Sequence, residues 1–393
     1  MKNYKLHTTE GFSDTFGYEM LIKNEIKNRI EKLFKSYGYD LIKTPALEYI
    51  DVYSSGGMQK PDLYNLINRQ GEVLSLCNDM TSSIVRFVAS NNLEGKMKFS
   101  YTADIFRYPK QYQGKKHQFL QAGIEYIGEN NINAEIETIY IAHKALKAIG
   151  INDFTIHVGS IKFLNLLFKD FNLSDDIIKK IKLYIEENDY VSLNEVLKSN
   201  LDESKAKFLY ELMLKGGKLK FIEHLILDLK DYSCVSELKF LKQIYNSLRE
   251  LGTDKIIFDF SICSYAKYYT GIVFSVYVDN ISKEVISGGR SDILFNEFDK
   301  DLADIGFGLD IDALGQYALE NNTIKIENQK YLSYHDSYSS YAYKNDDNFR
   351  DNGIIVNNLD FSSLDEAFKY AKANDYDKII YYKDDSFSLV EVK

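Results

Sequence analysis

The sequence predicts an α+β protein built from an antiparallel sheet flanked by helices, a helical insertion and a small C-terminal α/β domain. The order of strand-like and helical runs indicates that residues 1–320 form the antiparallel core. Within this core, residues from about 160 to 250 are helical by period almost throughout. The tail, residues 321–393, alternates strand and helix, which is typical of a small α/β module.

Length and composition limit the possible classes of protein. The chain has 393 residues, of which 45% are hydrophobic and 27% charged, as expected of a globular cytoplasmic protein. No apolar run approaches the roughly 18 residues of a membrane span. The net charge of −10 argues weakly against a nucleic-acid partner, because phosphate contacts favour a basic face. We expect no cofactor, and no metal site, because the histidines and the three distant cysteines show no ligand spacing.

The N-terminal part predicts two helices and three strands. Apolar residues at steps of three and four predict a helix over 17–37, which Gly38 ends. Residues 39–48 read as one strand whose Pro45 favours a sheet edge or a subunit contact. Two strands follow that turn at Gln70 and Gly71, and then a short helix with Thr81 or a neighbour as its cap.

The remaining elements follow from the same patterns. The predicted strands and helices are, in order, two strands around 106–128, a helix over 134–150, a strand over 153–160, the helical insertion, strands at 255–262, 269–278 and 284–289, and a helix near 310–320. Residues 304–314, "DIGFGLDIDAL", enter this last helix with two glycines. In the tail, Ser363 and Glu366 predict a capping box at the start of a helix.

One predicted strand, "HQFLQAGIEYIG", carries polar residues where an ordinary buried strand would be apolar. Because side chains alternate faces, Gln121, Gly123 and Glu125 share one face and apolar residues share the other. The polar face would form an open trough about 13 Å long between Gln121 and Glu125. If the preceding strand pairs with it as a hairpin, Arg107 lies beside this trough. A solvent-facing sheet surface with an ordinary ion pair is the simpler alternative.

Other short motifs favour a ligand site. Asp79 and Thr81 stand two residues apart at the end of a strand, so both would point one way. Tyr268 and Tyr269 precede a glycine, and Arg290 follows a diglycine turn that would let a ligand approach the backbone. Each motif is weak alone, and their order and spacing together are far more specific.

Together these motifs resemble the class II aminoacyl-tRNA synthetase core of histidyl-tRNA synthetases, over about residues 8–315. The matching stretches are "FRYPKQYQGKKHQFLQAGIEYIG", "YYTGIVF" and "SGGRSD". The resemblance implies that a histidine would bind through seven residues. Asp79 and Thr81 would meet its α-amino group, Gln121 its backbone, and Arg107 its carboxylate or a phosphate. Glu125 would accept a hydrogen bond from the imidazole, and Tyr268 and Tyr269 would form the pocket wall.

The sequence departs from the synthetases at positions that would contact phosphate. Ser264 and Cys77 stand where the family has arginines, Lys267 replaces an aspartate, and Ala313 stands at the arginine of the third class II motif. Adenylate formation needs clustered cations on the phosphoryl group under attack. The losses therefore argue against amino acid activation.

A synthetase-like core with these losses and a short, acidic tail resembles the regulatory subunits of ATP phosphoribosyltransferase. The resemblance implies a non-catalytic protein, required for the first step of histidine biosynthesis and for feedback regulation by histidine. It also implies a homodimer within a hetero-oligomer containing the short-form catalytic subunit, with no nucleic acid and no membrane as partner.

Two alternatives remain open from the sequence. One is a divergent histidyl-tRNA synthetase, and the other is a synthetase-like scaffold that binds no amino acid. Lys115, Lys116 and Arg290 are candidates for contact with an anion, and the two lysines could equally face water. Ser264 and Lys267 leave open whether histidine still binds.

Overall fold

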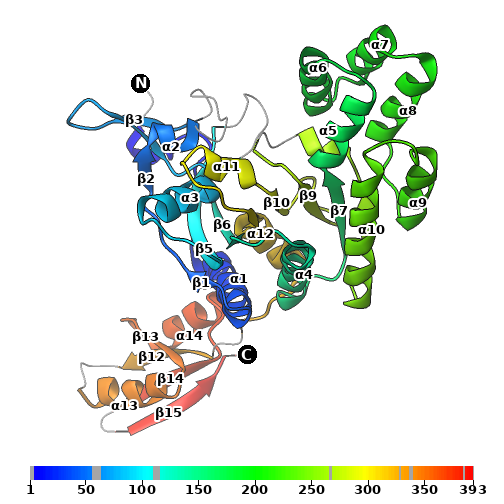
Figure 1. The fold of residues 1–393 in the computed structure, drawn as a ribbon. Coiled ribbons are helices and arrows are strands. Elements are labelled where there is room, and N and C mark those ends of the chain that lie inside the picture. The colour runs from blue at the N-terminus through cyan, green and yellow to red at the C-terminus, as the bar shows by residue number, and fades with distance from the viewer. Residues whose placement is uncertain are drawn as a thin grey trace. The chain divides into compact units, whose positions relative to one another are not determined.

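The chain divides into two compact units, Met1–Ile324 and Lys325–Lys393, as Figure 1 shows. The boundary expected from the sequence, after residue 320, lies slightly earlier in the chain. The computed structural model describes residues 4–54, 63–108, 116–264, 268–326, 329–335, 340–383 and 386–392.

An eight-stranded sheet forms the centre of the first unit. Its strand order is β1-β5-β6-β11-β10-β9-β7-β8. The strands are β1 (Asp40–Leu41), β5 (Met97–Phe106), β6 (Gln118–Ile127), β11 (Asp304–Asp310), β10 (Ile286–Arg290), β9 (Ile272–Val278), β7 (Phe154–Ser160) and β8 (Ile256–Phe258). The inner pairs are antiparallel, and the two edge pairs, β1 with β5 and β7 with β8, are parallel. The predicted antiparallel core is confirmed.

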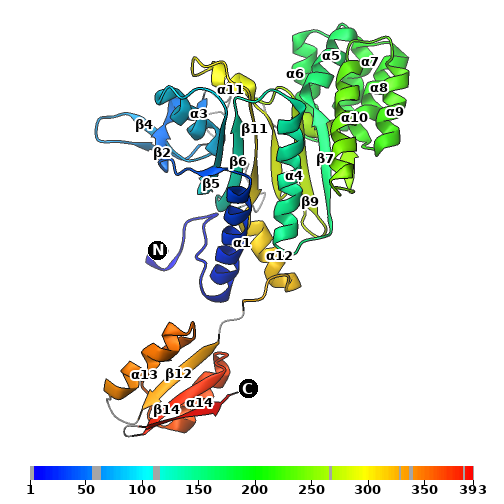
Figure 2. The same ribbon diagram turned by 60° about the horizontal axis from the view of Figure 1, so that its bottom comes forward.

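Three helices cover one face of this sheet, as Figure 2 shows: α1 (Gly17–Ser36), α4 (Ile132–Ala148) and α12 (Ile311–Asn321). Helix α1 buries its row of isoleucines completely, Ile22 and Ile26 among them. It stops before Gly38, whose φ of +80° is the left-handed conformation that favours glycine. The prediction of this helix and its stop is confirmed.

The opposite face carries the smaller elements of the first unit. They are the helices α2 (Ile50–Ser54), α3 (Met80–Ser90) and α11 (Asp292–Asn296), and a three-stranded sheet of β2 (Leu47–Tyr49), β4 (Val73–Leu76) and β3 (Asn65–Ile67). Helix α3 packs its apolar side against β5 and α11. The described residues of this unit also form two short 3-10 turns, η1 (Tyr4–Leu6) and η3 (Ser261–Ser264).

The prediction of one strand over 39–48 is wrong. Two short strands, β1 and β2, occupy its ends and belong to different sheets. Pro45 lies between them and in neither strand, because a proline has no N–H to donate to a ladder.

The helical insertion is confirmed between β7 and β8, and its helices gather beyond β7 in Figure 1. It contains α5 (Ile161–Asp170), α6 (Asp175–Glu186), α7 (Tyr190–Asn200), α8 (Glu203–Leu214), α9 (Leu219–Asp228) and α10 (Val235–Glu250).

The second unit is a four-stranded sheet with two helices, and its strand order is β13-β12-β14-β15. Its elements are β12 (Lys330–His335), α13 (Ser340–Asp351), β13 (Ile355–Asn358), α14 (Leu364–Ala373), β14 (Lys378–Lys383) and β15 (Ser386–Glu391). The capping box at α14 is half formed. Ser363 Oγ accepts from the Glu366 N–H at 3.2 Å, but the Glu366 carboxylate accepts from the N–H of Ser362 instead of that of the cap.

Candidate functional site

A pocket opens on the sheet face opposite α1, α4 and α12. The space between its lining residues, counted together with the open solvent at its mouth, is about 360 Å³. All seven residues expected to contact histidine lie around it. Its lining consists of Asp79, Thr81, Tyr101, Arg107, Gln121, Glu125, Tyr268, Tyr269, Ser287, Gly289, Ser291, Gly306, Phe307 and Gly308.

The predicted hairpin positions the polar face of β6. Strands β5 and β6 pair in an antiparallel register that sets Ala103 opposite Gln121 and Phe99 opposite Glu125. Ala122 and Ile124 on the other face are fully buried under the helices. The predicted alternation is therefore confirmed, and it directs Gln121 and Glu125 into the pocket.

Glu125 lies at the deep end of the pocket and is only 2% exposed. The Thr81 hydroxyl donates to its Oε1 at 2.5 Å. Its carboxylate lies over Gly306 of β11, where a Cβ would stand 1.9 Å from Oε2. Burial and the negative charge of Asp304 raise the pKa of Glu125 well above its usual value.

The middle of the pocket is narrower than the open trough expected from the sequence. Tyr101 stands opposite Gly123, and its ring crosses that glycine, where a Cβ would meet the phenol carbon at 2.4 Å. The Tyr101 hydroxyl then donates to Gln121 Oε1 at 2.9 Å. Because Gly123 has no side chain, there is room for the ring of Tyr101, which holds Gln121 in place.

Asp79 has two roles in the structure. It is the N-cap of α3, and its carboxylate accepts from the Ser82 N–H at 3.0 Å and from the Ser82 hydroxyl at 2.8 Å. The prediction that Asp79 and Thr81 extend a strand is wrong, because β4 ends at Leu76 and Thr81 lies in the first turn of α3. Both nevertheless line the pocket, since this helix begins at its wall.

Arg107 and the two tyrosines stand nearer the mouth. The Arg107 Nε–H donates to the Asn78 carbonyl at 3.3 Å, and the guanidinium lies 5.4 Å from the ring centre of Phe119. The rings of Tyr268 and Tyr269 meet edge to face with centres 4.8 Å apart.

Arg290 does not face the pocket, contrary to the anion contact expected from the sequence. Gly289 pairs with Gly306 on the pocket face, so alternation turns the next side chain of β10 towards α4. There Arg290 is 5% exposed and donates to Glu135 at 2.7 Å. It also pairs with Asp292 at 3.2 Å, which gives it a structural role.

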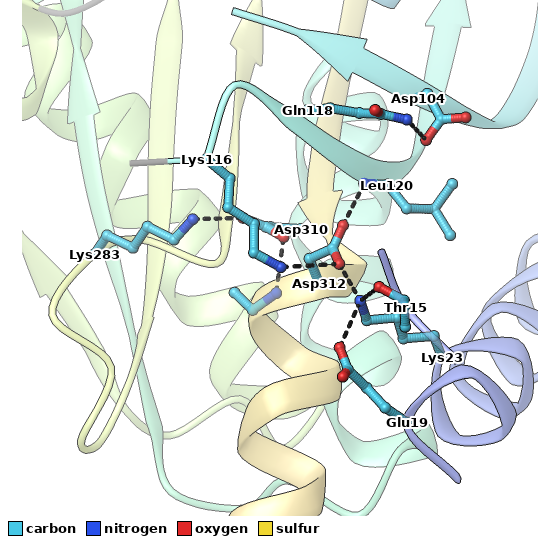
Figure 3. Close-up of polar contacts among 11 residues, drawn as sticks. Thr15, Glu19, Lys23, Asp104, Lys116, Gln118, Leu120, Lys283, Asp310 and Asp312 are labelled. Carbon is cyan, nitrogen blue, oxygen red and sulfur yellow. Dashed lines mark hydrogen bonds and ion pairs between the residues drawn. The ribbon is translucent and has the colours of Figure 1, made fainter. Parts of the chain in front are cut away.

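Lys116 is paired with one protein carboxylate, as Figure 3 shows. Its Nζ lies 3.6 Å from Asp312, which also forms an ion pair with Lys23. Lys283 pairs with Asp310 at 2.6 Å beside them. Although burial opposes ionisation of Asp312, hydrogen bonds from Lys23 and from the Leu120 N–H hold its pKa below the usual value. An anion at Lys116 would therefore compete with Asp312.

Some predictions fall on residues that the structure does not describe. Lys115 and Lys267 lie outside the described residues, and of Ser264 only the main chain, in η3, is described. Cys77 is buried, and burial raises the pKa of its thiol to about 11, so it supplies no charge to the pocket.

The strand that closes the pocket, β11, is not among the strands predicted from the sequence. β11 pairs with β6 on one side and β10 on the other, and its Gly306 and Gly308 lie beneath Glu125 and Gln121. Tyr101, Ser287 and Ser291 also line the pocket without having been expected there. The glycine spacing of two in "DIGFGLD" was the available signal, because alternate glycines leave one strand face open.

Known proteins are similar in sequence to this chain over almost its whole length. The sequence model of the histidyl-tRNA synthetase family matches residues 11–314. The ATP phosphoribosyltransferase regulatory subunit of Clostridium novyi (strain NT) is 30% identical, over 98% of this chain and 94% of its own. The chain belongs to this family of regulatory subunits. The same-named protein of Thermoanaerobacter sp. (strain X514) is also 30% identical, over 95% and 99% of the two chains.

Solved structures confirm the class II synthetase-like fold. A crystal structure from Bacillus halodurans C, described as an ATP phosphoribosyltransferase regulatory subunit/histidyl-tRNA synthetase, has a TM-score of 0.84 and 26% identity, over 97% of this chain and 99% of that one. The histidyl-tRNA synthetase of Nostoc sp. PCC 7120 shares the fold, with a TM-score of 0.79 and 20% identity, over 95% and 91%. In the described part of the chain, no helix is long and apolar enough to cross a membrane.

Proposed function

We propose that this chain is the non-catalytic regulatory subunit of an ATP phosphoribosyltransferase, the enzyme of the first step of histidine biosynthesis. It assembles as a homodimer with short-form catalytic subunits, and its pocket binds histidine as the feedback effector. The observation that carries the proposal is the gathering of the seven expected residues around one pocket, in a member of the regulatory-subunit family.

The chemistry of the pocket suits a histidine with its ring at the deep end. Glu125 there accepts from an imidazole N–H, and Gln121 is held ready by Tyr101 to meet the amino acid backbone. Asp79 supplies negative charge for the ammonium group. At the other end Arg107 lies over Phe119 and can meet the carboxylate, since a guanidinium binds carboxylates in a bidentate fork.

The surroundings of α12 support a non-catalytic role. The helix begins with Asp310 as its N-cap and carries Asp312 in its first turn. These carboxylates occupy the helix end that would otherwise attract phosphate, and they pair with Lys283, Lys116 and Lys23 (Figure 3). Cations that are already neutralised are poorly placed to stabilise a phosphoryl group under attack.

A protein that binds histidine without activating it is physically consistent with a regulatory role. A regulator must bind the end product with different affinity in two states of the assembly, and a coupling free energy of about 1–3 kcal/mol is sufficient. Such a protein needs the amino acid pocket and has no use for adenylation cations.

The test is phosphoribosyl-ATP formation by the short-form catalytic subunit, with and without this chain, while histidine is titrated. We expect activity only with the chain, and inhibition as histidine rises. Glu125→Gln should still activate but need about tenfold or more histidine for half inhibition, because a hydrogen bond to a charged group is worth about 1.5–3 kcal/mol. Glu250→Gln is the matched control, since Glu250 is exposed at the end of α10.

Three results would contradict the proposal in different ways. If the chain activates the catalytic subunit but histidine does not inhibit, the histidine site is contradicted and the catalytic partner is not. If the chain does not activate at all, the proposed partner is contradicted as well. Histidine-dependent pyrophosphate exchange by the chain alone would identify it as a synthetase.

A further inference from the structure

The N-terminal segment between η1 and α1, residues 7–16, is bound to the base of the hairpin of β5 and β6. The His117 N–H donates to the Gly11 carbonyl at 2.8 Å, and the His117 carbonyl accepts from the Arg107 N–H at 2.9 Å. Arg107 directly follows β5 and His117 directly precedes β6, so the second bond extends the hairpin pairing by one step. The main chain of His117 is therefore fixed between the N-terminal segment and Arg107.

The ring of His117 packs closely against Gly11. A Cβ at Gly11 would stand 2.1 Å from Cδ2 of this ring, and the φ of Gly11, +78°, lies in the left-handed region that favours glycine. Two separate constraints, the main-chain conformation and the room for the ring, thus favour glycine at this position. We call the pair Gly11 and His117 the latch.

Aromatic side chains surround the His117 ring on its other sides. Its aromatic neighbours, with the distances between ring centres, are Phe12 at 6.0 Å, Tyr64 at 5.9 Å and Tyr108 at 5.3 Å. Such distances are those of favourable ring contacts. The ring also forms a hydrogen bond through Nδ1 with the Tyr64 hydroxyl. The latch is therefore held by side chains as well as by the main chain.

The same aromatic cluster restrains the main chain on both sides of Arg107. Phe106, which precedes Arg107, has its ring centre 6.4 Å from that of Phe12. Tyr108, which follows Arg107, contacts the ring of the latch and also the ring of Tyr64, at 5.5 Å. Three consecutive residues at the end of β5 are thus tied to the latch and its neighbours.

Arg107 extends from this fixed main chain to the pocket. It lines the mouth, where its Nε–H donates to the Asn78 carbonyl at 3.3 Å and its guanidinium lies 5.4 Å from the ring centre of Phe119. A guanidinium binds a carboxylate through a planar fork, which must be aligned with the carboxylate to form both hydrogen bonds. Because the side chain is exposed, this alignment depends on the main chain from which it extends.

We propose that His117 is a positioning residue for Arg107, and that the latch fixes the guanidinium where the carboxylate of a bound histidine lies. This inference rests on the histidine binding proposed above. Neither residue of the latch is among those that line the pocket, so the latch acts through Arg107. Its effect is confined to the carboxylate end of the ligand, because Glu125 and Asp79 meet the imidazole and the ammonium.

The test compares the binding of L-histidine with that of histamine, which has the imidazole and the ammonium but no carboxylate. Arg107→Gln should weaken L-histidine about tenfold or more and leave histamine unchanged. His117→Ala should weaken L-histidine about fivefold or more, again without effect on histamine. Because His117 acts through Arg107, the double variant should bind L-histidine no more weakly than Arg107→Gln alone.

Three results would overturn the proposal. One is full affinity of His117→Ala for L-histidine. Another is equal weakening of L-histidine and histamine by His117→Ala, which would indicate a general effect on the pocket. The third is additive weakening in the double variant, which would separate His117 from Arg107.

A second variant tests the latch from the N-terminal side. Gly11→Ala places a Cβ against the His117 ring and should separate the Gly11 carbonyl from the His117 N–H. Gly252→Ala is the matched control, because Gly252 has a φ of +83° and nothing within 4 Å of its Cβ. Both variants strain the main chain in the same way, but only Gly11→Ala should weaken L-histidine about fivefold or more. Equal affinity of the two variants for L-histidine would overturn the proposal.

Hydrogen exchange of the Arg107 amide, followed by mass spectrometry, tests the latch without a ligand. The bond to the His117 carbonyl protects this amide, so Gly11→Ala should speed its exchange about tenfold or more relative to wild type and Gly252→Ala. Unchanged exchange would overturn the latch. Faster exchange in Gly11→Ala, together with no histidine binding by the wild-type chain, would contradict the proposed function and not the latch.

Discussion

Gly306 and Gly308 of β11 make room for the polar side chains of β6. A Cβ at Gly306 would meet both the Glu125 carboxylate and, at 2.3 Å, the main-chain oxygen of Ile124. The three atoms nearest to a Cβ at Gly308 would all belong to the side-chain amide of Gln121, the closest of them at 2.6 Å. Both glycines thus make room for a polar side chain of the pocket. At Gly306 the main chain of the neighbouring strand also leaves no room for a Cβ.

Alanine substitutions at the two glycines should distinguish an effect on histidine binding from an effect on the stability of the fold. Gly308→Ala should leave the free energy of unfolding nearly unchanged, because Gln121 can turn aside, yet weaken histidine binding about tenfold or more. Gly306→Ala should weaken binding and also destabilise the chain by about 1–3 kcal/mol, since the main chain cannot move easily. Urea unfolding and calorimetry check both. Equal stability of the two variants would contradict the assignment of the main-chain constraint to Gly306.

At the scale of elements, the start of α3 has two roles: its N-cap stabilises the helix, and the same residues form part of the pocket wall. The Asp79 carboxylate satisfies the Ser82 N–H, a donor that the first turn of a helix leaves unpaired, and is only 6% exposed. Thr81, in the same turn, donates to Glu125 of β6. The helix end is therefore held against the sheet at the place where the ligand's ammonium is proposed to bind.

Two substitutions of Asp79 distinguish these roles. Asp79→Ala should lose about 1 kcal/mol of stability, because alanine cannot cap, whereas Asp79→Asn should lose little, because asparagine is an equally good cap. Both should weaken binding of histidine, since both remove the charge that faces the ammonium. Neither should affect imidazole propionate, which lacks an amino group. Asp79→Asn with full histidine affinity would contradict the ammonium contact.

At the scale of the whole molecule, the sequence is sufficient to predict the parts of the fold that depend on local periodicity. The helices of the insertion, the hairpin of β5 and β6 and the alternating elements of the second unit all follow from apolar spacing. The pocket residues on β6 could be predicted for the same reason, because alternation alone places Gln121 and Glu125 on one face.

Features that depend on pairing between distant segments could not be predicted in this way. The glycines of β11 indicate only the approach to a helix when the sequence is considered alone, because glycines are rare in strands. The position of β11 between β6 and β10 explains them. The direction of Arg290 depends on its register with β11 and on Glu135 of α4. Tyr101 enters the pocket only because Gly123 stands opposite.

Direct calorimetry of L-histidine with the purified chain at pH 7 tests the central claim, that this pocket binds the amino acid. The account predicts saturable binding by wild type, about tenfold or more weakening in Glu125→Gln, and no change in Glu250→Gln. Absence of binding by wild type, or full affinity in Glu125→Gln, would contradict it.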